Sequence, residues 1–87
     1  MVEQKVVVQN ETGLHARPAS LLIEAANNYS AEVQLVYKNQ EVNAKSVMRV
    51  MSLGIGQGAE VTIRAEGNEE EDAVEELVEL IKSGFGE

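Results

Sequence analysis

The chain has no cysteine, no tryptophan, and only one proline and one histidine among its 87 residues. Without cysteine it can form neither a disulfide framework nor a thiolate zinc site, which suits a reducing cytosol. We expect no cofactor and no metal, because a single histidine would leave carboxylates alone to complete a metal site. The first residues contain no apolar run of signal-peptide length, so we expect a cytoplasmic protein that does not associate with a membrane.

Basic residues are also scarce. Seven lysines and arginines stand against fifteen acids, which gives a net charge of -8 at pH 7. This balance argues against direct binding of nucleic acid, since such proteins need a basic face to displace counterions. Acids are absent from residues 12–23 and 42–59, and these stretches carry Arg17, Lys45 and Arg49. If the fold brings the two stretches together, they form one apolar, weakly basic patch on an acidic body.

Hydrophobic patterns along the chain predict a single α+β domain over residues 1–87 with the element order βαββαβα. We expect an open-faced β-sandwich, in which three helices cover one face of a four-stranded antiparallel sheet. The expected strands are 2–9, 32–37, 40–44 and 60–66, and the expected helices are 16–28, 46–53 and 69–83. Asn68 and Glu71 resemble a capping box at the start of the last helix, and Gly84 can end it.

The segment Gly13-Leu14-His15-Ala16-Arg17-Pro18 contains both the histidine and the proline. Proline favours the first turn of a helix, so His15 should lie just before a helix N-terminus, beside free N–H groups and the positive end of the helix dipole. Arg17 adds a permanent cation whose planar donor fork fits phosphate oxygens. The segment is typical of a phosphoryl acceptor, although a lone histidine is also often an ordinary residue at a helix end.

Ser46 stands where the middle helix should begin. Its hydroxyl suits an N-cap, and the alternative is a regulatory phosphorylation site, because a phosphoserine at a helix N-terminus need not damage the fold. Val47, Met48 and Met51 follow on a helix too short to turn all three inward, so we expect one or two of them to be exposed as a docking patch. Core packing is the other interpretation, for which Val50 is better suited.

Residues 13–19 resemble the phosphohistidine signature of the HPr family, the phosphocarriers of the bacterial phosphoenolpyruvate:sugar phosphotransferase system. Residues 39–54, centred on Ser46, resemble the serine-phosphorylation signature of the same family. The resemblance implies that His15 accepts a phosphoryl group at Nδ1 from enzyme I and passes it to enzyme IIA components for sugar uptake. Arg17 would steady the group. A member of this family is a carrier rather than a turnover enzyme.

The serine signature implies that an HPr kinase/phosphorylase modifies Ser46 in carbon catabolite repression, and that the phosphoserine form binds a catabolite control repressor. One alternative is a regulatory paralogue that acts through phosphorylated Ser46 while His15 is idle, and a generic interaction domain is another. We also expect a monomer. Arg49 departs from the family pattern, because many serine-regulated relatives have a small residue at this position. The residues expected to dock partners are Ala16, Ser20, Lys45, Val47, Met48, Arg49 and Met51.

Overall fold

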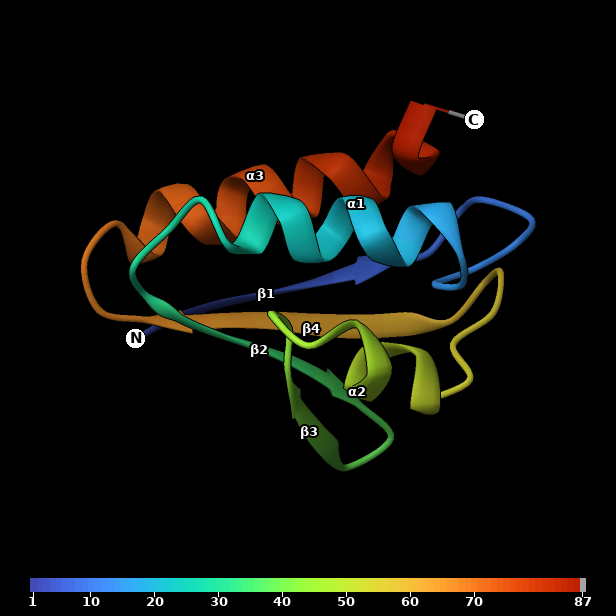
Figure 1. Ribbon diagram of the computed structural model, residues 1–87, viewed down its shortest axis with the longest axis horizontal. Coiled ribbons are helices and arrows are strands. Elements are labelled where there is room, and N and C mark those ends of the chain that lie inside the picture. The colour runs from blue at the N-terminus through green and yellow to red at the C-terminus, as the bar shows by residue number, and fades with distance from the viewer. Residues whose placement is uncertain (87) are drawn as a thin grey trace.

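The structure is a computed structural model that describes residues 1–86. Its elements are β1 (Val2–Val7), α1 (Arg17–Ala26), β2 (Glu32–Tyr37), β3 (Gln40–Asn43), α2 (Val47–Ser52), β4 (Glu60–Glu66), α3 (Glu70–Lys82) and a short 3-10 turn (Gly84–Gly86). The four strands form one antiparallel sheet in the order β1-β4-β2-β3. Helices α1 and α3 lie side by side over one face of the sheet, and α2 packs against α1 and β3 (Figure 1). The predicted α+β fold is confirmed.

The core lies between the sheet and the helices. Along β4, Val61, Ile63 and Ala65 are buried, while the residues between them point to the other face. Ile63 pairs across the sheet with Leu35 of β2, and both are fully buried. Helix α3 contributes Leu77 among others. Burial of each such aliphatic side chain is worth roughly 1.5–3 kcal/mol, so this layer supplies most of the stability.

The β2–β3 hairpin turns on two residues. Lys38 and Asn39 have φ of 48° and 67°, as a two-residue turn between antiparallel strands requires, and Gln40 already belongs to β3. This tight turn sets the register of β3, whose end leads directly to α2.

The capping box predicted at the start of α3 is wrong. The N-cap is Glu69, in the left-handed region, and no side chain caps the helix. The backbone N–H of Gly67 donates to a carboxylate oxygen of Glu70 at 3.0 Å, so the reciprocal contact is displaced by one residue from Asn68 and Glu71. Gly67 has φ of 123°, a conformation that residue spacing does not reveal. This hydrogen bond, together with the nearby amino terminus, lowers the pKa of Glu70.

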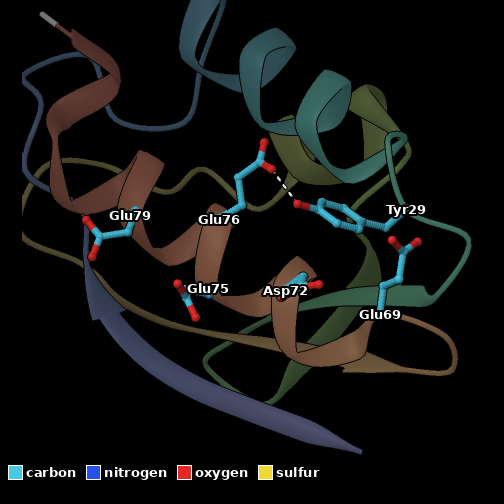
Figure 2. A pocket seen from close by; sticks show the side chains of 6 residues that line it. All are labelled: Tyr29, Glu69, Asp72, Glu75, Glu76 and Glu79. Atoms are coloured by element: carbon cyan, nitrogen blue, oxygen red, sulfur yellow. Dashed lines mark hydrogen bonds between the residues drawn. The ribbon is translucent and has the colours of Figure 1, made fainter.

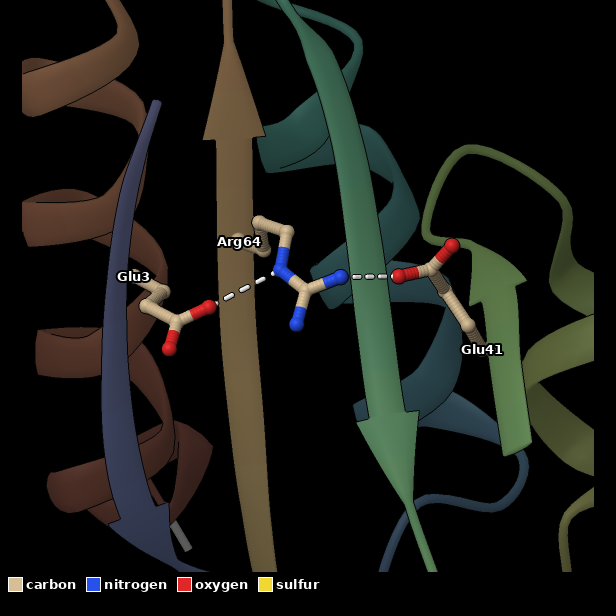
Figure 3. Close-up of polar contacts among 3 residues, drawn as sticks. All are labelled: Glu3, Glu41 and Arg64. Atoms are coloured by element: carbon tan, nitrogen blue, oxygen red, sulfur yellow. Dashed lines mark hydrogen bonds and ion pairs between the residues drawn. The ribbon is translucent and has the colours of Figure 1, made fainter. Parts of the chain in front are cut away.

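Arg64 connects three strands on the face of the sheet that the helices leave uncovered (Figure 3). Its Nε donates to Glu3 of β1 at 2.9 Å, and its Nη1 pairs with Glu41 of β3. Each exposed ion pair of this kind contributes little to stability. The single guanidinium offsets one of the two carboxylate charges on the open face.

Candidate functional site

The loop before α1 is held against the segment that follows α2. Gly13 has φ of 67°, and a Cβ on it would lie 2.3 Å from the carbonyl oxygen of Ile55. The N–H of the next residue, Leu14, donates to that same oxygen at 3.0 Å, and the Leu14 side chain is fully buried. This contact joins the two acid-free stretches of the chain, whose proximity the sequence left open, and His15 follows Leu14 directly.

Ala16 has φ of 53° and ψ of -124°, a backbone conformation that glycine adopts readily and alanine does not. A residue held this way stores about 1–3 kcal/mol of strain. Ala16 is also the N-cap of α1, and it supplies no side-chain oxygen to the first turn. The backbone N–H groups at the start of α1 are therefore uncapped by any side chain that the structure describes, immediately after His15.

His15 is half-buried and Arg17 is exposed. Helix α1 begins at Arg17 with Pro18 in its first turn, which confirms the predicted position of the imidazole at a helix N-terminus. Within residues 1–86, neither side chain takes part in a hydrogen bond or ion pair. A cation, uncapped N–H groups and an imidazole are thus adjacent, and this arrangement can receive a phosphoryl dianion.

Ser46 is the N-cap of α2, as one of its two interpretations predicts. Its Oγ accepts a hydrogen bond from the backbone N–H of Arg49, at a long 3.4 Å. The Ser46 side chain is half-buried. The hydroxyl therefore has a structural role that does not exclude modification.

Lys45 is more constrained than its charge suggests. Its Nζ donates to the carbonyl oxygen of Tyr29 at 2.7 Å, and its backbone N–H donates to Oδ1 of Asn43 at 2.8 Å. The first contact ties the start of α2 to the segment after α1. A partner that uses the Lys45 ammonium must compete with Tyr29, so its docking role remains a prediction.

The exposed apolar residues gather on α2. Val47, Met48 and Met51 are 37%, 80% and 38% exposed, whereas Val50 is fully buried. The expectation that only one or two of the three would be exposed is wrong, since all three are exposed. The reason is that the six-residue helix turns only Val50 fully into the core. Helix α1 packs against α2. We call the exposed residues of this region the α1–α2 surface: Ala16, Arg17, Ser20, Val47, Met48, Arg49 and Met51.

An acidic groove along α3 was not predicted as a unit, although the acids themselves were noted in the sequence. Tyr29, from the segment after α1, donates its hydroxyl to Glu76 across the groove (Figure 2). That hydrogen bond chiefly, with burial and the nearby carboxylates, raises the pKa of Tyr29 to about 12. The other residues that line the groove are Glu69, Asp72, Glu75 and Glu79. Across residues 1–86, no acidic or histidine cluster is arranged to hold a metal ion.

The raised pKa of Tyr29 predicts a loss of stability at high pH. The unfolded chain releases this proton near pH 10.0, and the folded protein keeps it to about 12, so the stabilisation is complete below 10.0 and disappears as pH rises through 12. Tyr29→Phe should flatten the decline of unfolding free energy over this interval, measured by urea unfolding. Tyr37→Phe, in the other tyrosine, is the control and should leave the decline in place. An equal decline in Tyr29→Phe and the parent protein would contradict the assignment.

Comparison with known proteins agrees with the geometry. Residues 2–83 match the family described as "PTS HPr component phosphorylation site". HPr-C-His from Thermoanaerobacter tengcongensis is similar along 100% of this chain and 98% of its own, at 48% identity and a TM-score of 0.98. The phosphocarrier protein HPr from Bacillus anthracis is similar along 92% of this chain and 95% of its own, at 41% identity and a TM-score of 0.89.

A third similar structure is Crh, the Bacillus subtilis catabolite repression protein, which was solved as a domain-swapped dimer. The match covers 97% of both chains at 44% identity and a TM-score of 0.77. No helix within residues 1–86 has the length and apolar character needed to cross a bilayer. With residues 2–83 matched to the family and its members alike in fold over nearly their whole length, the chain belongs to the HPr family of phosphocarrier proteins of the phosphotransferase system.

Proposed function

We propose that this chain carries a phosphoryl group on His15, accepts it from enzyme I charged by phosphoenolpyruvate, and passes it to enzyme IIA components during sugar uptake. The observation that carries the proposal is the placement of His15. Its imidazole directly precedes uncapped N–H groups of α1 and stands two residues from Arg17, whose guanidinium has no partner among residues 1–86.

In the transfer, an unprotonated ring nitrogen of His15 forms a bond to phosphorus while the bond from phosphorus to the donor group on enzyme I breaks. The phosphoryl group passes through a state in which charge spreads over its three outer oxygens. The Arg17 guanidinium and the N–H groups of the first turn supply donors to those oxygens. Release to enzyme IIA reverses the roles, so the carrier itself ends unchanged. Besides the nucleophile, the step requires only positioning and charge stabilisation from this chain.

The α1–α2 surface is the proposed contact with both partners. Its apolar centre on α2 and the cations Arg17 and Arg49 give a small surface suited to weak, fast docking with more than one acidic partner. Methionine side chains fit this purpose because they adapt to differently shaped partners. We further propose that residues 1–87 act as one monomeric, cytoplasmic domain.

Intact mass measurement tests the carrier function. The protein is incubated with enzyme I and phosphoenolpyruvate and weighed at mildly basic pH, and we expect a gain of one phosphoryl group that acid removes. His15→Ala is the control and should show no gain while folding as the parent does. No gain on the parent, with an enzyme I proven active on another HPr, would refute the proposal.

Ser46 is proposed as a second, regulatory site, phosphorylated by an HPr kinase/phosphorylase. A phosphate there adds nearly two negative charges at the first turn of α2, next to Val47. The fold tolerates the charge because it lies at the positive end of the helix, but an apolar partner surface does not. The same form would be recognised by a catabolite control repressor.

Ser46→Asp tests this regulation. We expect the KM of enzyme I for the protein to rise about tenfold, with kcat changed by less than about twofold, since the charge hinders docking rather than chemistry. Ser46→Ala is the matched control. It removes the N-cap at a cost of about 0.5–1 kcal/mol and should leave KM as in the parent. A KM equal to that of the parent in Ser46→Asp would contradict the proposal.

A regulator that acts through Ser46 alone is the second candidate function, favoured by the similarity to Crh. What weighs against it is that this chain has His15, followed by an α1 N-terminus without a side-chain cap and by Arg17. The mass experiment separates the two candidates: a regulator takes phosphate on Ser46 from a kinase and none on His15 from enzyme I.

A further inference from the structure

The methionines of this chain all lie outside its core. Met1, Met48 and Met51 are 69%, 80% and 38% exposed, and the buried hydrophobic cluster among residues 1–86 consists of aliphatic side chains and Phe85. Methionine commonly fills irregular gaps inside proteins. Here the interior is filled without it, so two thioethers remain on a helix that presents them to solvent.

Met48 and Met51 occupy the same side of α2. They are three residues apart, which places neighbouring side chains on one helix face, while Val50 between them points into the core. Both belong to the α1–α2 surface. Met1 lies elsewhere, because its amino group is 3.1 Å from Glu70 at the start of α3.

Their polarisable thioether sulfurs are the softest nucleophiles in the chain, and their exposure makes them accessible to an oxidant. The sequence contains no cysteine and no tryptophan to react in their place. Methionine sulfoxide formation is reversible, because thiol-dependent reductases restore the thioether. The surface therefore contains a chemically switchable group that needs no change in the fold to be reached.

We propose that Met48, with Met51 as a slower second target, is an oxidation-sensitive switch that weakens docking on the α1–α2 surface. A lone pair of the Met48 sulfur attacks the O–H oxygen of a hydroperoxide, an S–O bond forms and the O–O bond breaks. The transferred oxygen gives up its proton to the leaving oxygen, which departs as water or alcohol and leaves the sulfoxide. Sulfur is oxidised by two electrons and the peroxide is reduced. The inference rests on the proposed function, since it requires that partners dock on this surface.

The sulfoxide changes the surface because it replaces an apolar atom with a strong hydrogen-bond acceptor. When an apolar partner covers that acceptor without donating to it, the lost hydration is not recovered and binding weakens. The folded protein keeps its stability, because the 80% exposed Met48 side chain contributes little to the core. Docking should therefore respond to peroxide while the fold does not.

The experiment compares the full-length protein before and after graded treatment with hydrogen peroxide, with peptide mass mapping to locate each added oxygen. We expect Met48 to react before Met51. The KM of enzyme I for the treated protein should rise about tenfold, kcat should change by less than about twofold, and the melting temperature should stay the same. Incubation with a methionine sulfoxide reductase and dithiothreitol should return KM to its starting value.

The matched control is the double variant Met48→Leu/Met51→Leu, judged against its own untreated KM. Peroxide should leave that KM unchanged, whether or not Met1 is oxidised. An unchanged KM in the parent protein with Met48 mapped as sulfoxide overturns the inference alone, as does an equal rise in the double variant. Failure of the untreated parent to accept phosphate from active enzyme I overturns the proposed carrier function and this inference with it.

Discussion

Arg17→Glu should slow phosphoryl transfer from enzyme I to His15 by about 100- to 1000-fold, the loss that removal of a positioned charge donor typically causes. The substitution deletes the donor fork that we propose binds the incoming oxygens, and it introduces a carboxylate in its place. A like charge at this distance raises the energy of the transferring group, whereas the parent guanidinium lowers it.

The fold should survive this change. Arg17 is exposed and has no hydrogen-bonding or ionic partner within residues 1–86, and an acidic residue at the first position of α1 is favourable to the helix dipole. Rapid-quench measurement of single-turnover transfer gives the rate, and thermal unfolding checks stability. A parental transfer rate in Arg17→Glu would remove Arg17 from the mechanism.

Two further variants separate charge from geometry. Arg17→Lys keeps the cation but not the planar fork, so it should retain an intermediate rate. Arg49→Glu reverses the other cation of the α1–α2 surface, which lies on α2 rather than at the start of α1. It should raise KM more than it lowers kcat, since its charge acts on docking. Equal effects of Arg17→Glu and Arg49→Glu on kcat would mean that general surface charge is responsible.

Gly13→Ala should destabilise the protein by about 3–4 kcal/mol, near the upper end of single substitutions. The new Cβ would lie 2.3 Å from the Ile55 carbonyl oxygen and 2.7 Å from Cα of Gly56, distances that force the two backbones apart. Separation also breaks the hydrogen bond from Leu14 to Ile55. A domain of this size loses about 4–8 °C in melting temperature per kcal/mol, so calorimetry should record a drop of more than about 12 °C.

Gly54→Ala provides a matched control. Gly54 has φ of 65°, close to the 67° of Gly13, but a Cβ on it meets nothing within 4 Å. Both variants therefore strain the backbone alike, at about 1–2 kcal/mol, and only Gly13→Ala also forces the loops apart. Similar melting temperatures for the two variants would show that the close approach at Gly13 adds nothing to the loss of unfolding free energy.

Elements with a regular period could be predicted from the sequence. Alternation along β4 correctly placed Val61, Ile63 and Ala65 inside, and the proline at position 18 correctly placed a helix start after His15. The start of α3 could not be placed to the residue, since the positive φ of Gly67 and Glu69 shifts the turn without altering the hydrophobic pattern. Periodicity reports which residues are buried, and it is insensitive to such local backbone choices.

Contacts between distant segments were also beyond the sequence. Nothing near Lys45 indicates that its ammonium reaches the carbonyl of Tyr29, and nothing near Arg64 indicates two carboxylates from other strands. The strained backbone of Ala16 was equally hidden, because alanine normally avoids positive φ. In each case the surrounding fold imposes the conformation, so it is visible only once the fold is known.

The separation between the aliphatic interior and the side chains of α2 has an evolutionary consequence. Val47, Met48 and Met51 lie outside the buried core cluster, whereas Val50 holds the same helix to the interior. Selection can therefore alter the proposed docking surface of this helix without endangering the scaffold, and a laboratory can do the same. A library randomised at these three exposed positions should remain largely folded, which makes the helix a practical starting point for redirecting a phosphoryl relay to new recipients.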